Sequence, residues 1–292
     1  MKILLIGCNG QLGWELQRAC MTLGQVMALD YPQIDIRQSS ALRELIRSTR
    51  PDVLLNPAAY TNVEKAESDR EAAVEVNAKA PGVMAEEMKK LGGVFIHYST
   101  DYVFDGKKNA PYVETDDLNP LNEYGSSKLA GEQAVQAAGG VALIFRTSWV
   151  YAARGGNFAK TMLRLAKERE RLTVINDQFG APTGAELLAD VTAHAIRATL
   201  ADAGKSGLYH LVAGGETTWH GYARFVLEQA SAAGVALKAP PEAVDPVPTS
   251  AFPTPATRPH NSRLNTQKLQ STFGLTLPHW QAGVARMLRE TL

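Results

Sequence analysis

The sequence has 292 residues, which is enough to bury one large hydrophobic core or two modest ones. Its 30 basic residues balance 30 acidic ones, so charge gives no reason to expect a nucleic acid or an anionic membrane as partner. Two cysteines, Cys8 and Cys20, are too few for a disulfide scaffold, and no Cys/His cluster indicates zinc. We expect a cytoplasmic protein, because neither a signal peptide nor a bilayer-spanning apolar segment is apparent.

Short apolar runs alternate with amphipathic helical patterns in the first half of the chain. Runs that are apolar on both faces and separated by helices indicate buried parallel strands in repeated βαβ units. The predicted strands and helices are, in chain order, Lys2–Gly7, 12–23, Gln25–Asp30, 39–49, Asp52–Asn56, 68–91, Val94–Ser99, 124–138 and Val141–Thr147. We therefore predict an α/β fold with a doubly wound, parallel Rossmann-type sheet.

The second half of the chain differs in its pattern and predicts a smaller lobe. The predicted elements are a helix over 157–170, a strand at Leu172–Ile175, a helix over 184–200, a strand at Gly207–Val212, and helices over 219–233 and Trp280–Leu292. We expect the strand 172–175 to extend the main sheet. The Pro-rich stretch Pro240–Pro259 is either a flexible linker or a functional loop. The predicted division is a dinucleotide-binding Rossmann domain of residues 1–150 plus about 170–180, and a discontinuous C-terminal substrate lobe of about 151–169 and 181–292.

Three glycines, Gly7, Gly10 and Gly13, follow the first predicted strand and open a helix. Glycine permits positive φ in the turn and lets the backbone approach a pyrophosphate. The N-terminus of the helix then offers free N–H groups and a positive dipole end to that anion. The spacing is GxxGxxG and not GxGxxG, but it lies at the strand–helix junction where a dinucleotide would bind.

Asp30 ends the second predicted strand, where a carboxylate can accept hydrogen bonds from ribose hydroxyls. A carboxylate repels a 2′-phosphate, and no Arg or Lys lies within residues 8–12 to compensate. We therefore expect NADH to work, and NADPH to be tolerated if Asp30 can turn away; Arg37 is the nearest basic candidate. Further predicted cofactor contacts are Gln11, Leu12, Asp35, Ile36, Ala59, Tyr60, Thr61 and Tyr98.

Tyr124 and Lys128 form a YxxxK pair at the start of a predicted helix, where residues i and i+4 lie on one face. A free tyrosine titrates near about pH 10, and a nearby cation lowers that pKa. We predict Tyr124 as proton donor and Lys128 as its partner, which can also hold the nicotinamide ribose. The hydroxyl of Thr100, at the end of the fourth strand, can hydrogen-bond the substrate oxygen beside Tyr124.

These three features, in this order, resemble the extended short-chain dehydrogenases, which act largely on nucleotide-sugars. Longer strings across the chain resemble the dTDP-4-dehydrorhamnose reductase family. The strings are HYSTDYVFDG (97–106), PLNEYGSSKLAGE (120–132), FRTSWVYA (145–152), NDQFGAPTGAELLAD (176–190) and RPHNSRL (258–264). The resemblance implies that hydride from NADPH or NADH goes to C4 of dTDP-6-deoxy-L-lyxo-4-hexulose while Tyr124 protonates the alkoxide, giving dTDP-L-rhamnose.

The resemblance also implies a set of substrate contacts. With Thr100 and Tyr124, these contacts are Asp101 and Val103 at the sugar, Trp149 over the hexose face, and Arg258 and Arg263 on the diphosphate. From the residues alone, it is nearly as well supported that Arg258 and Arg263 are solvated arginines on the surface. The resemblance further implies a homodimer linked by structural Mg²⁺, with interfacial carboxylates at Glu15, Glu186 and Glu290.

Two other functions remain open. One is a related epimerase or dehydratase that retains its NAD, although Tyr102 stands where the dehydratases carry the Glu of their Thr-Asp-Glu motif. The other is a non-catalytic, dinucleotide-binding regulatory subunit of methionine adenosyltransferase, as in a related branch of the family. The intact Thr100, Tyr124 and Lys128 argue against the second, and stoichiometric NAD(P)H consumption with a keto-sugar would distinguish a reductase from both.

Overall fold

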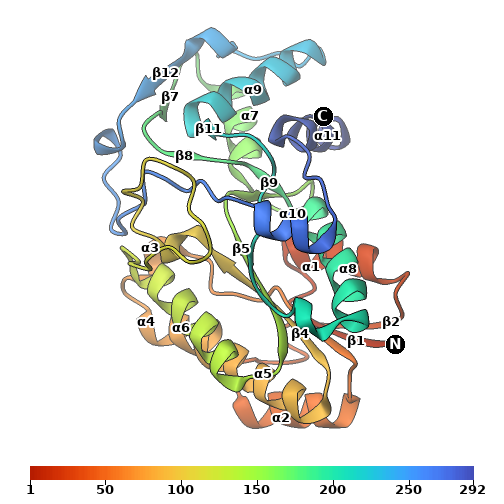
Figure 1. Cartoon of the computed structure of the whole chain (residues 1–292). Helices are drawn as coiled ribbons and strands as arrows, with labels where there is room; N and C mark the ends of the chain where they lie inside the picture. Colours follow the sequence, from red (N-terminus) through yellow and green to blue (C-terminus); the bar gives the residue numbers. More distant parts are fainter.

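The computed structural model describes residues 1–292 and contains a six-stranded parallel sheet in the order β10-β5-β4-β3-β1-β2 (Figure 1). Its strands are β1 (Lys2–Ile6), β2 (Gln25–Leu29), β3 (Val53–Asn56), β4 (Val94–Thr100), β5 (Val141–Thr147) and β10 (Gly207–His210). The central strands β3 and β4 are buried along their whole length, as the apolar residues at the start of each predict. The predicted doubly wound α/β fold is confirmed.

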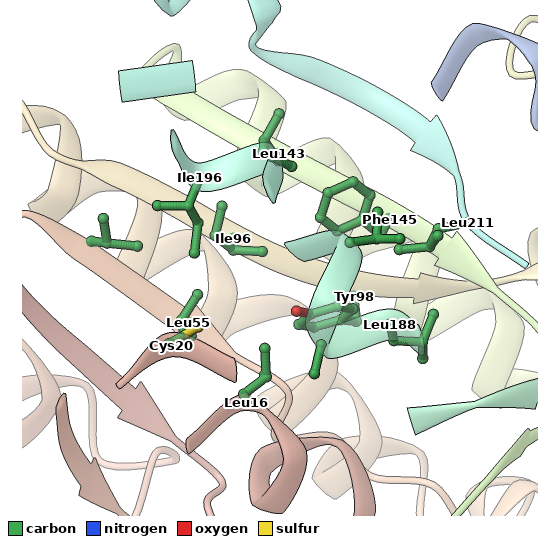
Figure 2. Packing of buried hydrophobic residues seen from close by; sticks show 14 of the residues in the cluster. Leu16, Cys20, Leu55, Ile96, Tyr98, Leu143, Phe145, Leu188, Ile196 and Leu211 are labelled. Carbon is green, nitrogen blue, oxygen red and sulfur yellow. The ribbon is translucent and has the colours of Figure 1, made fainter. Parts of the chain in front are cut away.

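Helices cover both faces of this sheet. One face packs against α1 (Gln11–Cys20) and α8 (Ala185–Ala201), and the other packs against α2 (Ser39–Thr49), α5 (Ala80–Leu91) and α6 (Glu123–Ala138). Figure 2 shows Leu16 of α1 and Leu188 of α8 facing Tyr98 and Phe145 of the sheet. Short helices α3 (Val63–Ala66) and α4 (Arg70–Val74) and a π-helical turn (Glu75–Lys79) lead into α5. No helix is long and apolar enough to cross a membrane.

The strand β7 (Leu172–Ile175) does not extend the main sheet, so that prediction is wrong. It pairs in parallel with β12 (Val244–Val247), and β10 takes the sixth position of the main sheet. The alternating burial of β7, with Leu172 and Val174 inside and Thr173 exposed, suits a strand covered on one face only.

The smaller lobe has its own core. Its helices are α7 (Phe158–Glu168), α9 (Trp219–Ala232) and α11 (Trp280–Thr291), and they share one hydrophobic cluster with β7 and β12. We infer that β7 belongs to this lobe, and that α8 and β10 belong to the Rossmann domain. Four two-residue strands, which form two pairs, and one further helix complete the fold: β6 (Val150–Tyr151) with β9 (Thr183–Gly184), β8 (Phe179–Gly180) with β11 (Thr217–Thr218), and α10 (Gln267–Phe273).

Candidate active site

A cavity of about 570 Å³ opens at the carboxyl ends of β1, β3 and β4. A second cavity of about 440 Å³ adjoins it, because Asp30 and Ala58 line both. Every predicted cofactor contact lines one of the two. Gly7, Gly10, Gln11, Leu12, Gly13, Asp30, Ala59, Thr61, Tyr98, Tyr124 and Lys128 line the larger, and Asp35, Ile36 and Tyr60 line the smaller.

Two of the three glycines in the glycine-rich turn, Gly7 and Gly13, have no room for a side chain. Gly7 has φ +98°, and a Cβ there would lie 2.9 Å from the Ala58 Cβ. A Cβ on Gly13 would lie 1.9 Å from the Gly7 carbonyl oxygen. Gly10 precedes α1 without a side-chain cap, so the first N–H groups of the helix remain free for an anion. This backbone cradle fits the diphosphate of a dinucleotide.

The Asp30 carboxylate is already fixed by two backbone donors. The Asn9 N–H and the Tyr31 N–H each donate to it at 2.8 Å. Arg37 is not free to read a phosphate, because it forms an ion pair with Asp35 at 2.7 Å. That hydrogen-bonded pair lowers the pKa of Asp35. The ribose end of the cavities therefore presents a carboxylate and no unpaired guanidinium.

Tyr124 and Lys128 lie in the first turns of α6, which begins after Asn122, whose side chain accepts from the Gly125 N–H at 2.8 Å. Burial lowers the pKa of Lys128 to about 8, against the opposing charge of Glu132. The Lys128 Nζ donates to the Tyr98 carbonyl oxygen. The ammonium is therefore held at the cavity wall by the end of β4.

Burial raises the pKa of Tyr124 to about 12, against the opposing effect of a hydrogen bond with Thr100. The prediction of a lowered pKa is wrong for the cofactor-free protein, because desolvation of the phenol dominates. Tyr124 therefore keeps its proton at neutral pH, as a proton donor must before the reaction.

Thr100 joins Tyr124 to the end of β4. Its hydroxyl donates to Asp101 Oδ1 at 3.1 Å and accepts from the Tyr102 N–H at 3.2 Å. Burial raises the pKa of Asp101 to about 7, against weaker hydrogen bonds from Ser262 and Thr100. The hydroxyl, the phenol and the carboxyl thus form one buried polar group at the carboxyl end of the strand.

A third cavity, of about 810 Å³, lies between the Pro-rich stretch, other elements of the smaller lobe and the loop at residues 105–107. Its walls include Thr249, Arg258, Trp219 and Lys107. The Pro-rich stretch forms β12 and then lines this cavity, and a functional role for it stays a prediction. The volume lies within the range typical of small-molecule sites.

The sequence of the whole chain, residues 1–292, matches the family model described as the RmlD substrate binding domain. The chain is 56% identical to the dTDP-4-dehydrorhamnose reductase of Escherichia coli over 294 residues, covering 99% of this chain and 98% of that protein. It is 50% identical to the enzyme of the same name from Burkholderia thailandensis, covering 100% of this chain and 99% of that protein. The chain belongs to the dTDP-4-dehydrorhamnose reductase family.

Solved structures of dTDP-4-dehydrorhamnose reductases have the same fold. One from Clostridium acetobutylicum has a TM-score of 0.90 at 33% identity, covering 99% of both chains. One from Bacillus anthracis, in complex with NADP, has a TM-score of 0.90 at 34% identity, also covering 99% of both chains. The predicted family and fold are therefore confirmed.

Among the predicted substrate contacts, Arg258 lines the large cavity and also forms an ion pair with Glu64 of α3 at 2.7 Å. Val103 does not line this cavity, and its contact with the sugar stays a prediction. It is the last residue of a tight turn, Asp101–Val103, and is buried in a hydrophobic cluster with Phe104 and Tyr112. The turn directs it into the core of the protein.

Four further predicted substrate contacts, Thr100, Asp101, Trp149 and Arg263, line none of the three cavities. Arg263 is held by Asn261 at 2.8 Å and by Glu216 at 3.2 Å. Trp149 stacks on Trp219 with ring centroids 3.7 Å apart, and it is Trp219 that lines the large cavity. Trp149 therefore packs behind a cavity wall that includes Trp219, a residue that the sequence analysis did not single out.

The three carboxylates predicted to bind Mg²⁺ are not a complete site within one chain. No group of three or more His, Cys, Asp or Glu side chains is placed to hold a metal ion. Glu15 pairs with Arg18 at 2.9 Å, and Glu290 pairs with Arg286 at 3.1 Å. Burial raises the pKa of Glu186, and repulsion from Glu15 and Glu290 contributes.

Proposed function

We propose that the protein reduces the C4 keto group of dTDP-6-deoxy-L-lyxo-4-hexulose to give dTDP-L-rhamnose, with NADPH or NADH as reductant. The observation that carries this proposal is a protonated, buried Tyr124 beside Thr100 and Lys128, in a cavity that begins at the glycine-rich turn. The family of the chain supplies the identity of the sugar.

The bound dihydronicotinamide would supply a hydride to the keto carbon. Reduction leaves a negative charge on the former keto oxygen, and the Tyr124 O–H is the group placed to protonate it. Thr100, which is hydrogen-bonded to Tyr124, orients the phenol and can donate to the same substrate oxygen. Lys128, held by the Tyr98 carbonyl, stabilises the phenolate that remains.

The protein lacks the base that a dehydration would need, because Tyr102 stands where the dehydratases carry Glu. Tyr102 follows Asp101 and packs edge-on against Tyr124, with ring centroids 5.7 Å apart. Burial also raises the pKa of Tyr102, so this phenol is not a base near neutral pH. Simple ketone reduction needs no such base, which supports reduction over loss of water.

The test is consumption of NADPH or NADH in the presence of the keto-sugar, followed by the absorbance of the reduced nicotinamide. Oxidation of the cofactor matched by formation of dTDP-L-rhamnose would support the proposal. Binding of cofactor without consumption would contradict it and favour a different keto-sugar or the regulatory function. Tyr124→Phe serves as the matched control, because it removes the donated proton and leaves the ring in place.

We further propose that two copies of the chain form a homodimer bridged by Mg²⁺ at Glu186. A hard cation relieves the repulsion among Glu186, Glu15 and Glu290, and carboxylate oxygens are the ligands it prefers. Because one chain does not complete the site, the second copy has to supply ligands. Sedimentation with Mg²⁺ and with a chelator tests this: the dimer should dissociate when Mg²⁺ is removed, and an unchanged mass would contradict the bridge.

A further inference from the structure

The loop between β6 and α7 lies against the glycine-rich turn. Gly155 of this loop lines the same cavity as Gly10, and a Cβ on Gly155 would lie 3.4 Å from the Gln11 Cγ. The neighbouring Arg154 stacks on Trp14 in the first turn of α1, with its guanidinium carbon 4.0 Å from the ring centroid. A cation from the smaller lobe is therefore placed beside the helix terminus that fits a diphosphate.

This guanidinium has no acidic partner. None of the ion pairs or side-chain hydrogen bonds in the structure includes Arg154. Most other arginines of the chain do pair with a carboxylate, as Arg18 does with Glu15. Stacking on an aromatic face satisfies the planar group without using its five donors. The donors of Arg154 therefore remain available to an anion.

The cavity itself offers little positive charge to a dinucleotide. Lys128 is its one basic lining residue, and its ammonium donates to the Tyr98 carbonyl. The N-terminus of α1 contributes only about half a unit of positive charge, whereas the diphosphate of a dinucleotide carries about two negative charges. Burial and Asp30 raise the pKa of the Cys8 thiol in the turn, whereas the charge of Arg154 opposes that increase. The electrostatic effect of Arg154 thus reaches the turn.

The loop is held in place from within its own lobe. The Lys160 Nζ donates to the Ala153 carbonyl and, at 2.9 Å, to the Gly155 carbonyl. The Asn157 side chain donates to the Ala152 carbonyl at 2.7 Å. Gly155 has φ +77°, a conformation that glycine adopts without strain. These contacts keep the loop backbone near α1 without using the donors of the Arg154 side chain.

We propose that Arg154 binds the diphosphate of the cofactor, and that Trp14 positions the guanidinium over the turn before the cofactor arrives. The diphosphate is favoured over the 2′-phosphate because Gly155 and Gln11 line the same cavity at the glycine-rich turn, whereas Asp30 and Arg37 lie toward the ribose. Guanidinium binds such oxygens through paired hydrogen bonds. The small lobe therefore contributes directly to cofactor affinity.

Calorimetric titration of the purified, cofactor-free protein tests this without relying on turnover. Arg154→Gln should weaken binding of NADH, NADPH and ADP-ribose by about tenfold each, since all three carry the diphosphate. The affinity should also depend less steeply on salt than in the unmodified protein, because one charge contact is lost. Trp14→Leu should cause a smaller loss, and Arg154→Lys should restore part of the affinity.

Arg169→Gln is the matched control, because Arg169 is also exposed and without an ion pair but ends α7 away from the cavity. It should bind all three ligands as the unmodified protein does. Thermal unfolding of Arg154→Gln should match that of the control, which excludes a folding defect. Unchanged affinities in Arg154→Gln would overturn the proposal. A loss confined to NADPH would also overturn it, because Arg154 would then contact the 2′-phosphate.

Discussion

Replacing Asp101 by Asn should change the free energy of unfolding in a pH-dependent way. The stability of Asp101→Asn relative to the unmodified protein should be greater at pH 8 than in acid. The carboxyl is 3% exposed, and burial raises its pKa from 3.8 to about 7. Between these values the folded protein holds a proton that the unfolded chain has released, so stability falls as the pH rises. The shift is about 3 units, which at about 1.4 kcal/mol per unit gives a loss of about 4 kcal/mol above about pH 7. The amide of Asn does not ionise, so Asp101→Asn should not lose this stability as the pH rises.

The assay is urea-induced unfolding of both proteins, without cofactor, at several pH values. About two of the three pH units spanned by the pKa shift of Asp101 lie above pH 5. The free energy of unfolding of Asp101→Asn, relative to the unmodified protein, should therefore increase by about 3 kcal/mol between about pH 5 and pH 8. Asp117→Asn, at an exposed position without an ion pair, is the control and should show a flat difference. The groups facing Asp101 are Thr100, Ser262 and the phenols of Tyr102 and Tyr124. A pH-independent difference for Asp101→Asn would refute the reasoning.

Four other substitutions test separate parts of the account. Gly13→Ala should weaken cofactor binding at least about tenfold by calorimetry, because its Cβ would lie 1.9 Å from the Gly7 carbonyl oxygen; normal affinity would mean that the turn can relax. Glu132→Ala leaves Arg146, its partner at 2.6 Å, buried and unpaired, and should cost about 3–5 kcal/mol in urea unfolding; a cost like that of a surface pair would contradict this. Tyr124→Phe should lower kcat at least about 100-fold with cofactor affinity retained, and comparable turnover would remove Tyr124 from the mechanism. Asp30→Ala should shift preference toward NADPH, and an unchanged ratio of the two cofactors' kcat/KM would show that Asp30 does not read the ribose.

Much of the fold could be predicted because its signals are local. Short apolar runs predicted β3 and β4, and the predicted helix over 39–49 has the bounds observed for α2. The glycine-rich turn and the YxxxK pair are also local patterns, so the cavity they line could be located from sequence. In each case the chemistry depends on residues a few positions apart.

The position of β7 could not be predicted, because periodicity reports burial and not the pairing partner. Its partner β12 lies within a Pro-rich stretch that carries no strand signal, with Pro246 inside the strand itself. β10 is short, and its pairing with β5 joins residues more than sixty positions apart in the chain. Long-range packing decided both strands.

The residues that line the large cavity were also predicted less well, because long-range packing decides which side chains reach it. Trp149 and Trp219 are seventy positions apart, and only their stacking shows which ring reaches the cavity. Arg258 and Arg263 look alike in sequence, yet one lines the cavity and the other is held by Asn261. No local pattern distinguishes a side chain that faces a cavity from one that supports its wall.

The most direct test of the central claim is the stoichiometry of the reaction with dTDP-6-deoxy-L-lyxo-4-hexulose. Purified protein is supplied with NADPH or NADH, and oxidised cofactor and dTDP-L-rhamnose are measured in the same sample. The account predicts one sugar reduced for each cofactor oxidised, with loss of both signals in Tyr124→Phe. Cofactor that binds but is never oxidised, or a sugar that changes without oxidation of cofactor, would contradict it.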